Sequence, residues 1–204
     1  TLMKILAGYE PISAGVVRID GEARSWSSSR EAEQAGIVLI HQELNLAEHL
    51  TLTQNLFLGH ELTRGGLLDE RTMATRAQHY LELVGLQRPP STKVRQLIVA
   101  EKQLVEIAKA LSRQARLLIM DEPTATLTPG ETARLFALIA RLKAQGTTII
   151  YISHKLDEVK QITDEVVVMR DGRFVSRGET ASFTRQQMAN LMVGREMSDM
   201  FPPR

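Results

Sequence analysis

The chain has 204 residues, of which 43% are hydrophobic and 24% are charged, and its formal net charge at pH 7 is +1. This length and composition are typical of one globular domain, and the balanced charge favours neither nucleic acid nor an acidic membrane surface as a partner. The sequence has no cysteine, which excludes disulfides, thiolate metal sites and a cysteine nucleophile within it. No apolar run in it reaches the roughly 18 residues that a membrane-spanning helix needs.

The first forty residues predict a helix, a strand that ends in a turn, and a buried strand. Apolar residues at helical spacing favour a helix over 1–7, which Gly8 would end. Residues 15–21 alternate like a strand and close on an Asp-Gly turn. The continuous apolar run over 36–40 is typical of a strand that is buried on both faces.

Residues 43–112 give mostly helical signals. Apolar residues recur at helical spacing over 69–84 and again over 104–111, and the sequence Pro89-Pro90 separates these two stretches. We therefore predict a helical insertion between the strands.

Strands and helices alternate in the last part of the chain. Strands are predicted at 116–121 and 147–152, helices at 129–145, 156–162 and 184–194, and a hairpin over 165–178 across an Asp-Gly turn. This alternation indicates an α/β fold, with a largely parallel sheet that helices cover on both faces.

The strongest chemical signal is a buried strand that runs into two acids, Asp121 and Glu122. In open α/β sheets the carboxyl end of a strand is where ligands bind. An acid sealed from water there needs a partner, and a Mg²⁺ ion carrying nucleotide phosphates would provide one. Because adjacent side chains point to opposite faces of a strand, we expect Asp121 to face the metal and Glu122 an attacking water. Taken alone, the pair is also compatible with a solvated strand end.

Two further strands end in polar residues. Gln42 follows the run at 37–40, and His154 follows the run at 149–152. Each residue alone would be more typical of an ordinary loop glutamine or of a structural histidine. The occurrence of all three strand ends in one chain favours a functional site.

These motifs, in this order, resemble those of the ABC ATPases. The resemblance places a Q-loop at Gln42, a Walker B motif over 117–122 and an H-loop at His154. It also places a D-loop at Ala125, Thr126, Leu127 and Thr128. The resemblance covers nearly the whole chain, including the helical insertion, and implies a P-loop NTPase-like fold with a mostly parallel sheet.

The resemblance also implies an organisation in three parts. Residues 1–42 and 113–183 would form the nucleotide-binding core, and 43–112 a helical signature subdomain. Residues 184–204 would form a C-terminal helix and a linker towards a second domain.

The family assigns a task to each motif, with ATP and Mg²⁺ as cofactors. Asp121 would hold Mg²⁺, and Gln42 would approach the metal and link the site to a membrane subunit. Glu122 would be the general base for the attack of water. His154 would contact the γ-phosphate and help to hold the transition state.

Three segments resemble a particular class of this family. Residues 105–111, 122–128 and 192–196 are similar to the first half of the tandem ATPases that serve ribose, xylose and galactose importers, including a threonine at Thr128 where most ABC proteins have aspartate. The implied partners are membrane permease subunits, a sugar-binding protein reached through them and a second nucleotide-binding domain, with no nucleic acid. The implied location is peripheral, on the cytoplasmic face of the cell membrane. The ATPase sequence does not select among the sugars.

The sequence departs from the family at the phosphate loop. That loop has the form G-x-x-G-x-G-K-[ST], and the resemblance implies that it would end just before Thr1. The 204 residues do not contain it, and Lys4 lies beyond the expected loop. The resemblance therefore implies a fragment that binds ATP poorly by itself and does not hydrolyse it.

The sequence also departs from the family at the signature loop, which usually reads Leu-Ser-Gly-Gly-Gln. Here it reads Leu97, Ile98, Val99, Ala100 and Glu101. The changes remove a hydroxyl donor, restrict a backbone that glycine leaves free and add a negative charge where phosphate is expected. Drift within the sugar class and a weak or silent site are both open interpretations.

Two rival functions follow from the same residues. One is a degenerate ABC domain that binds ATP but barely hydrolyses it, which Ile98 favours and the intact Glu122 and His154 oppose. The other is a soluble ABC protein of DNA repair or translation without a permease. A strongly basic insertion would favour that function, and residues 43–112 are not strongly basic.

Overall fold

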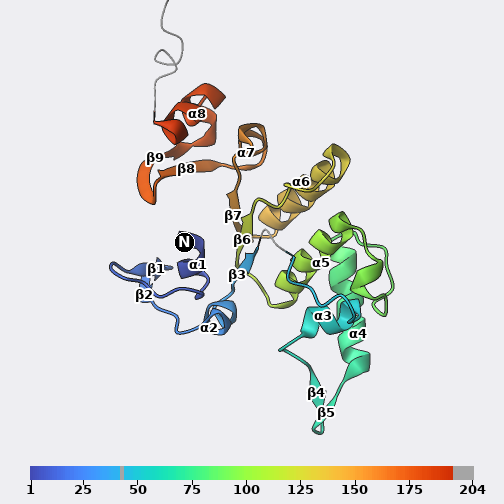
Figure 1. Cartoon of the computed structure of the whole chain (residues 1–204). Helices are drawn as coiled ribbons and strands as arrows, with labels where there is room; N and C mark the ends of the chain where they lie inside the picture. The colour runs from blue at the N-terminus through green and yellow to red at the C-terminus, as the bar shows by residue number, and fades with distance from the viewer. Residues whose placement is uncertain (42–43, 195–204) are drawn as a thin grey trace, which may run out of the picture. The chain divides into compact units, whose positions relative to one another are not determined.

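The computed structural model describes residues 1–41 and 44–194. The chain divides into two compact units, and the boundary lies between Ile150 and Tyr151. The ribbon of Figure 1 follows the chain through both units.

A three-stranded sheet with the order β3-β6-β7 runs through the first unit. Its strands are β3 (Ile37–Ile40), β6 (Leu117–Asp121) and β7 (Thr148–Ile152). β3 and β6 pair in parallel, in a register that sets Ile40 opposite Met120. The three central residues of β6 are fully buried, which confirms the strand that the continuous apolar run predicts.

The elements before this sheet are α1 (Leu2–Leu6), β1 (Val17–Ile19), β2 (Glu22–Arg24) and α2 (Ser29–Gln34). β1 and β2 form an antiparallel hairpin across the predicted Asp-Gly turn, and the strand after the turn was not predicted. Its turn needs a positive φ at Asp20 (52°) and at Gly21 (82°), a conformation that Asp-Gly pairs adopt readily. The side chain of Ser28 caps α2 by accepting a hydrogen bond from the backbone N–H of Glu31.

The predicted helical insertion contains α3 (Leu52–Phe57), α4 (Glu70–Leu83) and α5 (Val99–Ser112), which pack against one another. A short 3-10 helix, Val94–Gln96, precedes α5. Thr51 caps α3 and Asp69 caps α4 through their side chains. These caps explain where the two helices begin.

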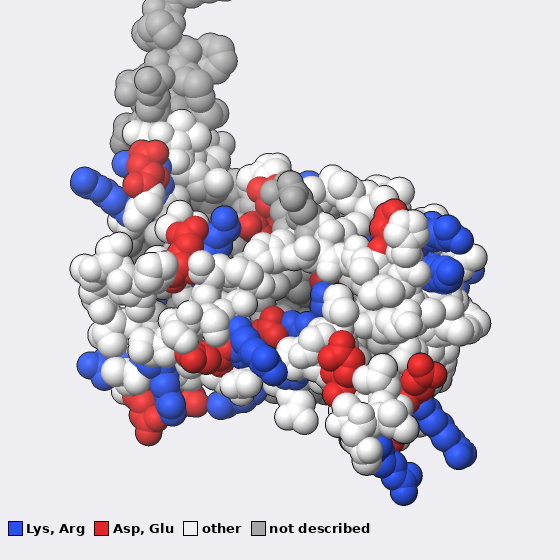
Figure 2. All heavy atoms as spheres, turned by 60° about the horizontal axis from the view of Figure 1, so that its bottom comes forward, with Lys and Arg blue, Asp and Glu red and all other residues white. Residues whose placement is uncertain are grey.

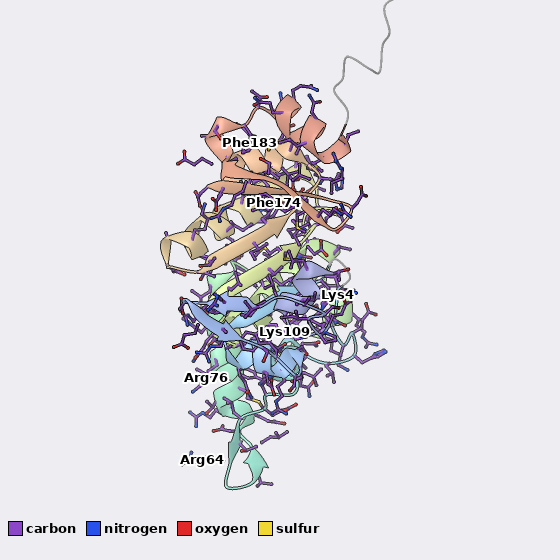
Figure 3. All side chains as sticks on the ribbon, turned by 90° about the vertical axis from the view of Figure 1, so that its left-hand side faces the viewer. Lys4, Arg64, Arg76, Lys109, Phe174 and Phe183 are labelled. Carbon is purple, nitrogen blue, oxygen red and sulfur yellow. The ribbon has the colours of Figure 1, made fainter. Side chains whose placement is uncertain are left out.

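A small hairpin that the sequence did not predict projects between α3 and α4. It consists of β4 (Thr63–Arg64) and β5 (Leu67–Leu68), and Figure 3 labels Arg64 on it. Gly65 and Gly66 both have positive φ, which makes the turn possible. Strands of two residues carry too little alternation to be recognised in a sequence.

The last helix of the first unit is α6 (Pro129–Ala144). Pro129 stands at its first position, where a missing N–H costs nothing, and Thr128 caps it through a capping box with Glu131. The helix buries one apolar face, formed by Leu135, Phe136, Leu138, Ile139 and Leu142. Gly146, with φ of 90°, follows its end.

The second unit contains α7 (Leu156–Ile162), β8 (Glu165–Arg170), β9 (Arg173–Glu179), a 3-10 turn (Thr180–Ser182) and α8 (Arg185–Val193). Its small core consists of Val159, Val166, Val168 and Met188. The hairpin of β8 and β9 turns at Asp171 and Gly172, both with positive φ, so the predicted hairpin is confirmed. Of the helices within 1–41 and 44–194, none has the length and apolar character needed to cross a membrane.

Candidate functional site

Two strands of the first unit end side by side at one edge of the sheet. β3 and β6 are parallel and Ile40 faces Met120, so His41 and Asp121 both lie just at or beyond this carboxyl edge. Asp121 is the last residue of β6 and is half-buried. The common edge predicted from the sequence is therefore present for these two strands. Gln42, the predicted Q-loop residue, lies outside the described residues.

The chain turns sharply at Glu122. Its φ is 47°, in the left-handed region that few residues other than glycine adopt. Its carbonyl accepts a hydrogen bond from the Ala125 N–H at 3.1 Å, and the following Pro123 and Thr124 are buried. A residue in this region costs about 1 kcal/mol or more, and such residues concentrate at functional sites. The surrounding fold thus holds Glu122 in a specific, costly position directly after the strand.

The predicted D-loop leads from this turn into α6. The Leu127 N–H donates to the Thr124 carbonyl at 3.3 Å. At Thr128 the backbone N–H and the hydroxyl each donate to Oε2 of Glu131 at 2.8 Å. These two bonds, the backbone one first, lower the pKa of Glu131. Thr128 therefore has a structural task as a helix cap.

His154 lies in the second unit, on a turn before α7 that its neighbours hold. The Lys155 N–H donates to the Ser153 hydroxyl oxygen at 3.0 Å. The carboxylate of Glu158 accepts hydrogen bonds from the Ser153 hydroxyl and from the Tyr151 hydroxyl, the latter at 2.6 Å. His154 itself is exposed. Its approach to the γ-phosphate beside Glu122 stays a prediction.

The predicted signature segment forms the start of α5. Leu97 is buried, whereas Ile98 and Val99 are 61% and 47% exposed. Ile98 occupies the N-cap position and gives the helix no side-chain cap, because it carries no oxygen. Two large apolar side chains therefore face solvent, Ile98 where the family usually has serine and Val99 where it usually has glycine.

Glu101, which ends the signature segment, is turned back onto the protein. Its Oε2 accepts from the Ile98 N–H at 3.1 Å, and its Oε1 accepts from Arg88 Nε at 2.8 Å. The hydrogen bond and the charge of Glu101 together raise the pKa of Arg88. The negative charge expected near phosphate is thus partly neutralised inside this chain.

A pair of charged residues on α5 holds the chain beyond the Q-loop, and sequence reasoning missed both. Glu106 is only 8% exposed, and its Oε1 accepts from the Asn45 N–H at 2.7 Å. Lys109 Nζ donates to the Asn45 carbonyl at 3.2 Å. Burial lowers the pKa of Lys109, and the carboxylate of Glu106 opposes that shift.

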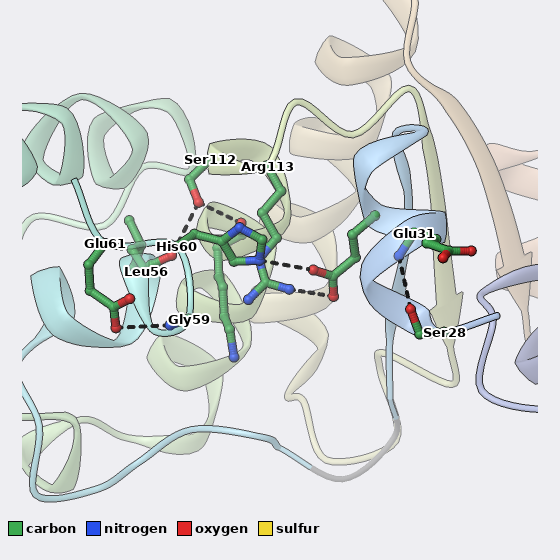
Figure 4. A network of polar contacts seen from close by, with 10 residues as sticks. Ser28, Glu31, Leu56, Gly59, His60, Glu61, Ser112 and Arg113 are labelled. Carbon is green, nitrogen blue, oxygen red and sulfur yellow. Dashed lines mark hydrogen bonds and ion pairs between the residues drawn. The ribbon is translucent and has the colours of Figure 1, made fainter. Parts of the chain in front are cut away.

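A second polar cluster lies at the C-terminal end of α5. Figure 4 shows Arg113 and His60 meeting one carboxylate, that of Glu33 on α2. Arg113 forms an ion pair with Glu33 Oε1, and His60 Nε2 lies 3.4 Å from Glu33 Oε2. The spacing of Glu106, Lys109 and Arg113, three and four residues apart, was the signal that could have revealed this polar face.

A small cavity of about 50 Å³ lies between the two clusters. It is lined by the four charged residues Glu33, Glu106, Lys109 and Arg113, together with Tyr9, the end of β3, His41 and Asn45. The ring of Tyr9 meets the ring of His41 edge-on, with centroids 5.0 Å apart. The cavity has room for water, which polar groups of this density can hold.

The side chains at the strand edge could supply a single carboxylate ligand to a metal ion. Within 1–41 and 44–194, no three His, Asp or Glu side chains gather in a way that would hold a metal ion. Mg²⁺ commonly takes one or two carboxylates, adds phosphate oxygens and keeps several waters. Asp121 offers one carboxylate at the end of a buried strand, which fits that pattern.

The fold is that of an ATP-binding cassette. A solved ATP-binding cassette of an ABC transporter matches it with a TM-score of 0.77 and 26% sequence identity, over 93% of this chain and 78% of that chain. In sequence, residues 1–125 match the ABC transporter family. The chain belongs to the ABC transporter family, as its motifs predicted.

Two curated relatives match almost the whole chain. The xylose import ATP-binding protein XylG of Geobacillus kaustophilus is 44% identical over 204 residues, which are 99% of this chain and 40% of the relative. The ribose import ATP-binding protein RbsA of Yersinia pestis is 46% identical over 201 residues, which are 98% of this chain and 40% of the relative. The chain therefore spans well under half the length of these relatives.

Proposed function

We propose that this chain is an ATP-binding and ATP-hydrolysing domain of a subunit that energises a sugar ABC importer. The observation that carries the proposal is the acidic turn at the carboxyl edge of the sheet. There Asp121 ends a buried strand and Glu122 is held at a positive φ, within a chain of the ABC transporter family. The relatives named for xylose and ribose import support the sugar class.

The proposed chemistry is attack of water on the γ-phosphate of ATP. Asp121 would hold a Mg²⁺ ion, which when bound would neutralise negative charge on the phosphates in the transition state. Glu122 would orient the attacking water and accept its proton, as a general base does. His154 would donate a hydrogen bond to the γ-phosphate, and Gln42 would report the state of the site to the permease.

The signature segment would serve a different ATP molecule. In a pair of facing domains, the start of α5 would cap the nucleotide that the second domain binds. Exposed Ile98 offers no donor to phosphate, and Glu101 is occupied by Arg88. We therefore propose that the two composite sites are unequal and that the site built on Glu122 does most of the turnover. The site built on Glu122 would be capped by the signature of the second domain. If that signature is also irregular, the protein would bind ATP but hydrolyse it weakly, which is the rival function.

The proposed partners are permease subunits at the cytoplasmic face of the membrane and, through them, a sugar-binding protein. A soluble ABC protein that acts on nucleic acid is less well supported. Lys and Arg side chains are interspersed with Asp and Glu over the face drawn in Figure 2, whereas nucleic-acid binding typically uses a basic patch.

The test is reconstitution of the full-length protein with its candidate permease in lipid vesicles. ATP hydrolysis should require Mg²⁺ and should rise when a binding protein loaded with one of ribose, xylose or galactose is added. The sugar that raises it identifies the substrate. Full hydrolysis by a protein that captures no membrane subunit would instead support the soluble class.

A further inference from the structure

The carboxylate of Glu158 contacts three polar side chains that precede it in the second unit. Its Oε2 accepts a hydrogen bond from the Tyr151 hydroxyl at 2.6 Å and another from the Ser153 hydroxyl at 3.4 Å. Its Oε1 lies 3.3 Å from Lys155 Nζ, and the Glu158 side chain is only 12% exposed. One carboxylate therefore holds the residues on both sides of position 154.

These contacts differ from those of an ordinary helix cap. Glu158 is the third residue of α7, and in a capping box a glutamate there would accept from the backbone N–H of the N-cap residue, which is Lys155. That N–H donates instead to the Ser153 hydroxyl oxygen at 3.0 Å. The carboxylate of Glu158 reaches past the start of the helix to Tyr151. It therefore ties α7 to the residues on the far side of the turn that carries His154.

The burial pattern shows which part of this turn is held and which part is presented to solvent. Tyr151 and Ser153 are half-buried, whereas His154 is exposed. Val159, directly after Glu158, belongs to the core of the second unit, so the helix that carries the carboxylate is itself anchored. Hydrogen bonds to a charged carboxylate are stronger than neutral ones. The backbone around His154 is thus fixed from inside, while its imidazole lies at the surface.

We propose that Glu158 is a positioning residue for His154 in the ATPase reaction. By holding Ser153 and Lys155, it fixes the backbone from which the imidazole extends. The role is exerted through His154 and not by contact with the nucleotide, so Glu158 is not a catalytic group. The inference rests on the proposed function, because it assumes that His154 serves the hydrolysis of ATP.

The experiment compares substitutions in the full-length protein. Glu158→Ala removes all three contacts, Glu158→Gln keeps an acceptor oxygen without the charge, and Tyr151→Phe removes one hydroxyl and keeps the ring. Asp157→Ala is the matched control, since Asp157 lies beside Glu158 on α7 and pairs with Arg185 on α8. Each change is made in the unchanged protein and again together with His154→Ala. The readouts are kcat and KM for Mg·ATP.

Glu158→Ala should lower kcat by about tenfold with a smaller change in KM, because a misplaced donor weakens an interaction made in the transition state. Glu158→Gln and Tyr151→Phe should give smaller losses, and Asp157→Ala should leave kcat unchanged. In the His154→Ala background, Glu158→Ala should cause no further loss, since residues that act through one group are not additive. If Glu158→Ala does not fold, Tyr151→Phe provides the same comparison between the two backgrounds.

Two results would overturn the positioning role alone. One is a kcat for Glu158→Ala equal to that of Asp157→Ala. The other is the same fractional loss of kcat with and without His154, which would mean that Glu158 acts on the fold in general. Absence of Mg·ATP hydrolysis by the unchanged protein would instead overturn the proposed function.

Discussion

The end of β6 and the start of α5 are both proposed to contact ATP, yet they differ in chemistry. At the end of β6 the acids Asp121 and Glu122 are present, and the fold maintains a costly backbone conformation at Glu122. At the start of α5, Ile98 is exposed without any polar group, and Arg88 engages Glu101. The chain therefore keeps the groups expected to break a phosphate bond and lacks the side-chain donors expected to cap a second nucleotide.

The largest expected effect tests the proposed role of the acids at the end of β6. In the full-length protein, Glu122→Gln should slow ATP turnover by about 10²–10⁴-fold while ATP binding survives, because an amide orients water but does not take its proton. Steady-state hydrolysis and nucleotide binding measure the two quantities. Glu131→Gln, the same chemical change on α6, is the control and should leave turnover near normal. Near-normal turnover in Glu122→Gln would place the base elsewhere, with His154 the first residue to examine.

His154→Ala should give a smaller loss. Removal of one hydrogen bond to a charged phosphate should lower kcat by roughly tenfold to a hundredfold. The exposed His49, which precedes α3 and has no assigned role, supplies a matched His49→Ala control. Equal rates in the two variants would separate His154 from the chemistry.

The second half of the comparison is sharpened by changing the signature segment. Ile98→Ser with Glu101→Gln should strengthen ATP binding at the site that this segment caps by about tenfold, since one hydrogen bond to a charged group is regained. The single changes should be unequal. Because Arg88 already holds Glu101 at 2.8 Å, Ile98→Ser alone should account for most of the gain, as measured by nucleotide occupancy at low ATP. If the double change does not strengthen ATP binding, the divergent signature is sequence drift within the sugar class without an effect on the site.

The smallest expected effect concerns Thr128, at the end of the D-loop. Thr128→Ala removes the cap of α6 and should lower the free energy of unfolding by about 1 kcal/mol, whereas Thr128→Ser, which keeps the hydroxyl as acceptor and donor, should preserve it. Denaturant unfolding measures both. The Thr128 bonds lower the folded pKa of Glu131, so their stabilisation is complete above its unfolded pKa of about 4.3 and is lost as the pH falls through the folded value. A Thr128→Ser variant as unstable as Thr128→Ala would show that the hydroxyl is not what caps the helix.

The strand-end site could be predicted because its signal is local. A buried parallel strand needs an unbroken apolar run, so the acids that interrupt it at Asp121 and Glu122 stand out. The two Asp-Gly turns, which begin at Asp20 and Asp171, were predictable for a similar reason. In such a turn both the aspartate and the glycine readily adopt a positive φ. His154 and the signature segment were found by resemblance, and their chemical roles remain predictions.

Other features could not be predicted because they depend on tertiary contacts. The positive φ of Glu122 and the burial of the two residues after it are features that the sequence does not reveal. Glu106 and Lys109 read as the polar face of an amphipathic helix until the structure shows them on the backbone of Asn45. The hairpin of β4 and β5 was missed because its strands are too short to show alternation.

The central claim, that the two ATP sites are unequal, is tested most directly by nucleotide occupancy per site in the full-length protein at limiting ATP. We predict that the site built on Asp121 and Glu122 binds ATP first and hydrolyses it. The site capped by Ile98 should bind ATP only at a concentration roughly tenfold higher or more. Equal filling of both sites at low ATP, with equal turnover, would contradict it.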